Sequence, residues 1–322
     1  MDHRFSPRPA PFRLFTASLA CFGWGIVVPT VILRADTIYV TDSSDNTVLR
    51  YDLLGNGSVF ASSGLDTPNG IAVDGSGNIY VSNAPIFGSQ TVTRFTPSAV
   101  GSQFATGPVS GSGNNGLAFD ASGNLFVATD GGVDKITPDG TRTSFATLSG
   151  GGAQDLEFDS GGNLIVVQYG ASKVVSITPG GSVTDLITTG LNGPRSIAIS
   201  NSGLIYIGNM NDNTVVRFSA VGVNLGVFAN SGLLAPTGLA FDSQSNLYAV
   251  NNGNGTSSGI EKFDPEGNAT LFADTEGARL VNLFIVAAVP EASTWTAMVF
   301  LGAAAGWGFW RNRRVIGTSA NG

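Results

Sequence analysis

The stretch Asn115–Thr129 reads NGLAFDASGNLFVAT, and variants of it recur along most of the chain. Four other segments match it: NGIAVDGSGNIYVSN from Asn69, QDLEFDSGGNLIVVQ from Gln154, RSIAISNSGLIYIGN from Arg195 and TGLAFDSQSNLYAVN from Thr237. The equivalent residue of the second predicted strand in the five copies is Val81, Val127, Val166, Ile207 and Ala249. These residues are spaced by 46, 39, 41 and 42 positions. Self-similarity at such a period is the signature of a repeat architecture.

Each unit is expected to hold four short strands. An apolar run such as Leu117–Phe119 precedes a turn of the form Asp-x-x-Gly-Asn, and a second run such as Leu125–Val127 follows it. Gly and Asn provide the positive φ that a tight hairpin needs. Third strands are predicted at Thr47–Tyr51, Val92–Phe95, Val174–Ile177 and Val215–Phe218, and fourth strands around Phe60, Phe104, Phe145, Leu186, Phe228 and Phe272. Four strands in about 42 residues are typical of a β-propeller blade.

The ends of the repeat region predict an all-β ring of six blades. The chain enters at Thr37–Asp42 (TIYVTD) without an inner strand before it, and Leu280–Val286 follows the last repeat as a lone apolar strand. We expect this strand to complete the first blade, which removes two free sheet edges. A seven-bladed ring is the alternative, because Asn282–Ile285 also resembles Asn246–Ala249, although no further strands follow it.

Composition excludes several classes of protein. The chain has 44 Gly among 322 residues and only 12% charged residues, which does not fit a coiled coil, and it lacks the strict Gly-x-y period of collagen. Its single Cys, Cys21, and its single His, His3, both precede the repeats. A disulfide framework, a Cys-based zinc site and His-dependent catalysis are therefore excluded for residues 36–288.

Residues 1–35 are predicted to be an export signal. Arg4, Arg8 and Arg13 precede the apolar run Leu14–Leu33, and a basic segment followed by an apolar one is typical of secretory signals. The run is long for a signal, so an uncleaved anchor is the alternative.

Residues 289–322 carry a second targeting pattern. The motif Val289–Ser293 is followed by the apolar stretch Trp295–Trp310, predicted to be a transmembrane helix, and then by Arg311, Arg313 and Arg314. Sixteen apolar residues are marginal for a ~30 Å hydrocarbon core, but aromatic ends and a following basic cluster suit a membrane boundary.

This tail resembles the PEP-CTERM sorting signal of Gram-negative bacteria. Pro290 and Glu291 match the motif, whereas Ala292 stands where the family usually has a second Pro. The resemblance implies processing by an exosortase-type partner, a transient anchor in the inner membrane, and delivery to the cell surface or extracellular matrix. A plain C-terminal anchor helix is the alternative.

The charge is unevenly distributed. Seven of the 16 basic residues lie in the two tails, but only two of the 23 acidic residues do, so residues 36–288 carry a net charge of −12. A domain this acidic repels phosphates, and no nucleic-acid partner is expected. The same charge favours solubility outside the cell and weak cation binding.

The repeats across residues 36–288 resemble NHL repeats and the six-bladed propellers of the gluconolactonase and regucalcin family. The start of each inner strand then lies at the mouth of the central channel, where the candidates are Asn69, Asn115, Gln154, Asp155, Arg195 and Thr237, with Arg279 near the sixth position. In that family, a Glu, two Asn and an Asp hold a divalent metal at this mouth. The resemblance thus implies a Ca²⁺ site at Asn69, Asn115 and Asp155, but the Glu has no match and Arg195 adds a positive charge.

Glu157 lies on an inner strand where the other copies have Ala. It is either an acid with a raised pKa, of the kind that strictosidine-synthase-like enzymes use, or a structural carboxylate facing Arg195.

The repeated turn acids Asp74, Asp120, Asp159 and Asp242 are interpreted as structural, because Asp in a turn accepts hydrogen bonds from turn amides. Streptogramin lyases and amidating lyases have similar repeats but rely on His.

The sequence therefore predicts an exported propeller with a binding or scaffolding role toward an extracellular protein or polysaccharide. No catalytic residue is assigned. No cofactor is expected apart from Ca²⁺, which belongs to the alternative function, a divergent lactone hydrolase. This architecture hosts many functions, so the repeats define the fold and leave the activity open.

Overall fold

A computed structural model of the chain describes residues 36–85, 90–107, 115–253, 257–275 and 278–286. These residues form 24 β-strands, and within them no helix is long and apolar enough to cross a bilayer. The predicted export signal at residues 1–35 and the predicted sorting tail at residues 289–322 lie outside the described residues.

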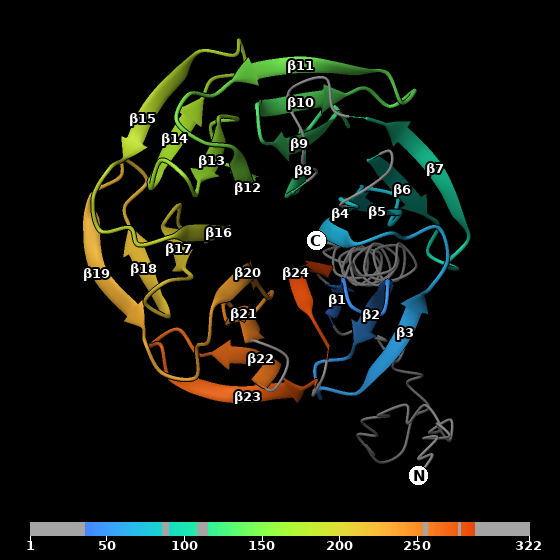
Figure 1. Ribbon diagram of the computed structural model, residues 1–322. Helices are drawn as coiled ribbons and strands as arrows, with labels where there is room; N and C mark the ends of the chain where they lie inside the picture. The colour runs from blue at the N-terminus through green and yellow to red at the C-terminus, as the bar shows by residue number, and fades with distance from the viewer. Residues whose placement is uncertain (1–35, 86–89, 108–114, 254–256, 276–277, 287–322) are drawn as a thin grey trace, which may run out of the picture. The chain divides into compact units, whose positions relative to one another are not determined.

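The strands form six antiparallel sheets of four strands each, the blades, whose strands are named below from the axis outward (Figure 1). Blade 1 comprises β24 (Leu280–Val286), β1 (Thr37–Asp42), β2 (Thr47–Tyr51) and β3 (Gly57–Ala61). Blade 2 comprises β4 (Pro68–Val73), β5 (Ile79–Asn83), β6 (Thr91–Phe95) and β7 (Gly101–Thr106). Blade 3 comprises β8 (Leu117–Phe119), β9 (Leu125–Thr129), β10 (Gly132–Ile136) and β11 (Arg142–Thr147).

The remaining three blades repeat this order. Blade 4 comprises β12 (Ala153–Phe158), β13 (Leu164–Gln168), β14 (Lys173–Ile177) and β15 (Val183–Ile187). Blade 5 comprises β16 (Pro194–Ile199), β17 (Ile205–Asn209), β18 (Thr214–Phe218) and β19 (Asn224–Ala229). Blade 6 comprises β20 (Pro236–Phe241), β21 (Leu247–Gly253), β22 (Ser257–Phe263) and β23 (Ala269–Asp274). The predicted third and fourth strands of the units are confirmed.

The ring closes on blade 1. Strand β24 pairs with β1, with Val40 opposite Leu283 and Ile38 opposite Ile285. On its other side β24 contacts β20 and β4, so that the inner strands β4, β8, β12, β16, β20 and β24 surround one axis (Figure 1). The six-bladed prediction with a C-terminal closing strand is confirmed, and the seven-bladed alternative is wrong. Closure leaves no inner strand without neighbours on both sides.

Repeated side chains explain why each unit folds in the same way. In the turn between β8 and β9, Asp120 Oδ1 accepts the N–H groups of Ser122 and Asn124, and its Oδ2 accepts a 2.7 Å bond from the Asn124 amide. Gly123 has φ +80°, which favours glycine. The same bonds occur at Asp74, Asp159 and Asp242. The structural interpretation of these acids is confirmed.

The core lies between the faces of successive blades. Strands β5, β9, β13 and β17 are buried along their whole length. Tyr80 of blade 2 packs edge-to-face against Phe104 of its own outer strand and Phe119 of blade 3, each with ring centroids 4.9 Å apart. Tyr206 makes the equivalent contacts with Phe228 and Phe241. These interlocked faces fix the inner strands around the axis, where the candidate residues lie.

Asparagines at the end of the second strand hold the loops on the mouth side. Asn83 Oδ1 accepts the N–H of Asp66, and Asn209 Oδ1 accepts that of Asn192, at 3.1 Å in both cases. Asn251 bonds Leu234 in the same way, and its amide donates to the carbonyl of Gly232. The sequence analysis did not predict this role of the asparagines, although the second strands share the endings YVSN, YIGN and YAVN.

Candidate functional site

The register of the strand pairs places most of the predicted channel residues at the same position along their inner strands. Ile71, Leu117, Leu156, Ile197, Leu239 and Leu283 pair with equivalent residues of their second strands. Counting back two positions from each gives Asn69, Asn115, Gln154, Arg195, Thr237 and Val281, which we call the mouth ring. The predicted sixth position, Arg279, is therefore taken by Val281, because Arg279 lies two residues before the equivalent place. Arg279 instead lies at the start of β24, where its N–H bonds Asp42 and Ser44.

Two members of the mouth ring are bonded to each other. The Asn69 amide donates a 3.0 Å hydrogen bond to Asn115 Oδ1, and the Asn115 amide donates a 2.8 Å bond to the carbonyl of Ala153. Thr41 Oγ1 and Ser82 Oγ donate to the carbonyls of Asn69 and Asn115, at 2.6 and 2.8 Å. The two asparagines thus link blades 2, 3 and 4 in a continuous chain of hydrogen bonds.

Asp155 lies one residue beyond the ring, where other blades have Gly70, Gly116 or Gly238. It is 7% exposed, and its two oxygens accept the N–H groups of Leu156 and Ile197, at 3.0 and 3.1 Å. A Cβ on Gly116 would collide with this carboxylate, which shows how closely the inner strands approach. Burial raises the pKa of Asp155 to about 7, and the hydrogen bonds from Ile197 and Leu156 offset only part of that effect.

Glu157 lies on the same face of β12 as Asp155, and its Oε2 accepts a 2.8 Å bond from the N–H of Ile199. Among the described residues, Glu157 forms no ion pair with Arg195. The prediction that Glu157 pairs with Arg195 is therefore wrong, and its carboxylate bonds the backbone of β16 instead. Burial raises its pKa to about 8, and the charge of Asp155 adds to the rise, while the bond from Ile199 opposes it. Asp155 and Glu157 therefore join blade 4 to blade 5 by hydrogen bonds to the N–H groups of Ile197 and Ile199 on β16, and we call this pair of carboxyl groups the ladder.

The predicted calcium ligands do not fit a divalent cation. Asn115 Oδ1 already accepts the Asn69 amide, and both oxygens of Asp155 accept backbone N–H groups. In the described parts of the chain, no group of three His, Cys, Asp or Glu side chains gathers in a way that could hold a metal.

The other half of the mouth ring is different. Gln154 and Arg195 are half-buried, and within the described residues neither side chain makes a hydrogen bond or ion pair; the Thr237 hydroxyl is buried without a partner. Burial lowers the pKa of the Arg195 guanidinium; Tyr169 opposes this effect, the positive charge of Arg279 adds to it, and Asp155 opposes it. Two arginines thus lie within electrostatic reach at one side of the mouth.

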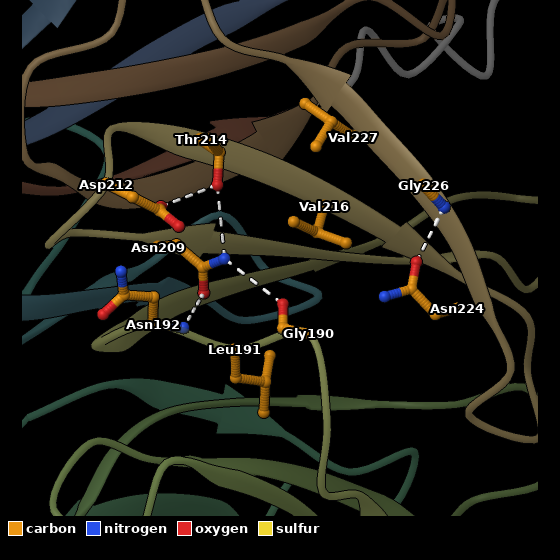
Figure 2. Close-up of a pocket in the computed structure, with 10 residues that line it drawn as sticks. All are labelled: Gly190, Leu191, Asn192, Asn209, Asp212, Thr214, Val216, Asn224, Gly226 and Val227. Carbon is orange, nitrogen blue, oxygen red and sulfur yellow. Dashed lines mark hydrogen bonds between the residues drawn. The ribbon is translucent and has the colours of Figure 1, made fainter.

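A pocket of about 320 Å³ lies apart from the mouth ring, on blade 5 beside the loop that enters it from blade 4. Figure 2 shows Asn209 at its polar end, bonded to Gly190, Asn192 and Thr214, with Asp212 beside Thr214. Leu191, Val216 and Val227 form its apolar part, and Gly226 in β19 leaves the space open. Sequence reasoning missed this pocket; the glycine within the strand Asn224–Ala229 was the available signal.

Comparison with known proteins places the chain among β-propellers. The beta-propeller repeat family SBBP matches residues 53–82, which run from the outer part of blade 1 into β5. No curated protein matches the sequence.

Three solved structures illustrate the likeness. One is a nidogen/laminin complex, with a TM-score of 0.68 and 14% identity over 80% of this chain and 100% of that chain. Another is regucalcin, a calcium-binding protein from Agrobacterium tumefaciens, with a TM-score of 0.53 and 20% identity over 71% of this chain and 85% of that chain. The third is a catalytically inactive histidine-to-alanine variant of virginiamycin B lyase from Staphylococcus aureus with quinupristin. Its TM-score is 0.57, with 14% identity over 74% of this chain and 80% of that chain. At these identities the likeness shows the fold alone.

Proposed function

We propose that this chain is an exported propeller that binds an extracellular protein or polysaccharide through its mouth face and catalyses no reaction there. The observation that carries the proposal is the use of the channel carboxylates: Asp155 and Glu157 accept backbone N–H groups of the ring and hold blades together. A general acid or a metal ligand must instead present its carboxyl group to substrate or metal.

The neighbours support a binding role in two ways. One of them is a propeller seen in a complex of two proteins, nidogen and laminin. The lyase neighbour is inactive in a variant with one histidine replaced by alanine, and residues 36–288 of this chain contain no His.

The first and last strands of the propeller meet at the end of blade 1 that lies away from the mouth ring. Thr37, at the start of β1, is the cross-strand partner of Val286, at the end of β24. Thr37 and Val286 therefore lie at one end of blade 1, and Leu280, near the mouth, lies at the other end of β24.

Delivery to the surface has a direct test. A variant lacking residues 289–322 should be soluble and released, whereas the full chain should fractionate with the cell envelope. Continued membrane retention of the shortened chain would assign the anchor to residues 1–35 and contradict the sorting role of the tail.

The alternative function is a calcium-dependent lactone hydrolase, favoured by one observation: Asn69 and Asn115 do lie together at the mouth, 3.0 Å apart. Calcium titration of the purified full chain, followed by an assay of lactone turnover, separates the two functions. We expect no stoichiometric calcium binding and no turnover. Tight binding that is lost in Asn115→Ala, together with turnover, would establish the hydrolase and overturn the binding proposal.

A further inference from the structure

On one side of the mouth ring, three neighbouring polar side chains make no hydrogen bond to a described residue. Gln154, Arg195 and Thr237 stand at equivalent positions of three successive inner strands, β12, β16 and β20. We call them the open arc. They provide an amide, a guanidinium and a hydroxyl, and the hydroxyl of Thr237 belongs to a residue that is 5% exposed and has no hydrogen-bond partner. A buried donor without a partner is costly, so a site of this kind favours a ligand that accepts hydrogen bonds.

Arg195 forms no ion pair with a described residue, although the charge of Asp155 acts on it. The acids nearest to it on β12 are Asp155 and Glu157, whose oxygens already accept the N–H groups of Leu156, Ile197 and Ile199. Ion pairs join Arg142 to Asp134, Lys173 to Asp185 and Lys262 to Asp242, and none of these three involves the mouth. A half-buried guanidinium that forms no ion pair is an attractive place for an anion.

Arg279 adds a second positive charge at the same side. Its backbone is fixed to blade 1, since its N–H bonds Asp42 at 3.2 Å and Ser44 at 3.0 Å, and its carbonyl accepts the N–H of Ser43. Its side chain is exposed, and it forms no ion pair with any described residue. Two guanidinium groups that repel each other are stabilised together when one anion lies between them.

We propose that the open arc, with Arg279, binds a single carboxylate carried by an otherwise neutral saccharide. This inference rests on the binding function proposed above and names its ligand class. Arg195 and Arg279 would take the carboxylate oxygens, and Gln154 and Thr237 would bond neighbouring hydroxyl groups. The net charge of −12 over residues 36–288 disfavours a polyanion, because each further negative charge on the ligand would meet a repelling surface.

The test measures binding to the purified full chain by calorimetry, with three probes. These are an aldobiouronic acid (glucuronate linked to xylose), xylobiose as its neutral counterpart, and inorganic phosphate. We expect the acidic disaccharide to bind, and its affinity to fall at least tenfold in Arg195→Gln and in Arg279→Gln. The matched control is Arg50→Gln on β2, which removes the same charge away from the mouth and should leave affinity unchanged. Added salt should weaken binding.

The outcomes separate the possibilities. Phosphate binding with the same arginine dependence, and no binding of the acidic disaccharide, would keep the anion site and overturn the saccharide assignment. Equal binding of xylobiose, or an equal loss of affinity in Arg50→Gln, would overturn the anion site. No binding of any probe would also overturn it, while the binding function proposed above stands or falls on the calcium and lactone assays. Circular dichroism of each variant shows whether it is folded.

Discussion

Blades 2 and 3 meet the channel mouth with Asn69 and Asn115, and blades 4 to 6 meet it with Gln154, Arg195 and Thr237, all at the same strand position. The first pair forms a closed arc, in which one amide bonds the other and then the carbonyl of Ala153. The second set is the open arc, whose side chains have no bonds to described residues. An equivalent backbone position therefore does not define a role: a mouth side chain is structural only where its neighbour offers a matching partner.

The largest expected effect comes from opening the ring where the two arcs join. Deletion of residues 280–288 removes β24, which pairs with β1 and contributes Leu280, Leu283 and Ile285 to the core. We expect loss of the cooperative unfolding transition, because blade 1 loses its inner strand and blades 2 and 6 lose a neighbour. Thermal unfolding followed by circular dichroism is the measurement. Unchanged melting would contradict the closure.

The second prediction concerns the pH dependence of the ladder at the start of the open arc. The pKa values of Asp155 and Glu157 are raised to about 7 and about 8 in the folded chain. The folded chain therefore holds protons that the unfolded chain releases above about pH 4. The stabilisation is complete below that pH and is lost as pH rises through 7 and 8, with an upper limit of about 1.4 kcal/mol per pH unit for each carboxyl group.

Urea midpoints at pH 5, 6, 7 and 8 should therefore fall with rising pH. Glu157→Gln keeps an acceptor for the N–H of Ile199 but cannot ionise, so its midpoint should fall less. The range stops at pH 5 because Asp74 and Asp264, whose pKa values are lowered by turn hydrogen bonds, act in the opposite direction in more acidic solution. A rise in stability with pH, or the same slope in Glu157→Gln, would refute the role of the ladder.

The third prediction compares the arcs directly. Asn115→Ala should lower the free energy of unfolding by about 1–3 kcal/mol, because the Asn69 amide and the carbonyl of Ala153 lose their partner. Gln154→Ala is the matched variant in the open arc and should change it by less than about 0.5 kcal/mol. Urea denaturation measures both. Equal losses in the two variants would erase the distinction between closed and open arcs.

The smallest expected effect is at Thr237. Thr237→Val removes a buried hydroxyl that has no partner and keeps the branched shape, so stability should be unchanged or higher by up to about 1 kcal/mol. Thermal unfolding with and without the acidic disaccharide is the measurement. A clear loss of stability in the absence of ligand would show that the hydroxyl has a structural partner and does not belong to the open arc.

The sequence alone predicts the strands, the blade count, the closure by Leu280–Val286 and the structural role of the turn acids such as Asp120. These features are local or repeated: alternation of apolar residues, a turn of five residues and a period of about 42 residues can each be seen within one unit. It also brought Asn69, Asn115, Gln154, Arg195 and Thr237 to one end of the inner strands, because copies of one unit place equivalent residues at equivalent depth.

The folded ring is needed to see which of those side chains pair, that Glu157 reaches the backbone of β16, and that Val281 takes the sixth mouth position. The pocket beside Asn209 also depends on how the loop at Gly190–Asn192 packs against blade 5. These contacts could not be predicted because they join segments of different units over distances set by the closed ring. A repeat pattern describes each blade in isolation, whereas hydrogen bonds and burial at the mouth depend on two blades and on the axis between them.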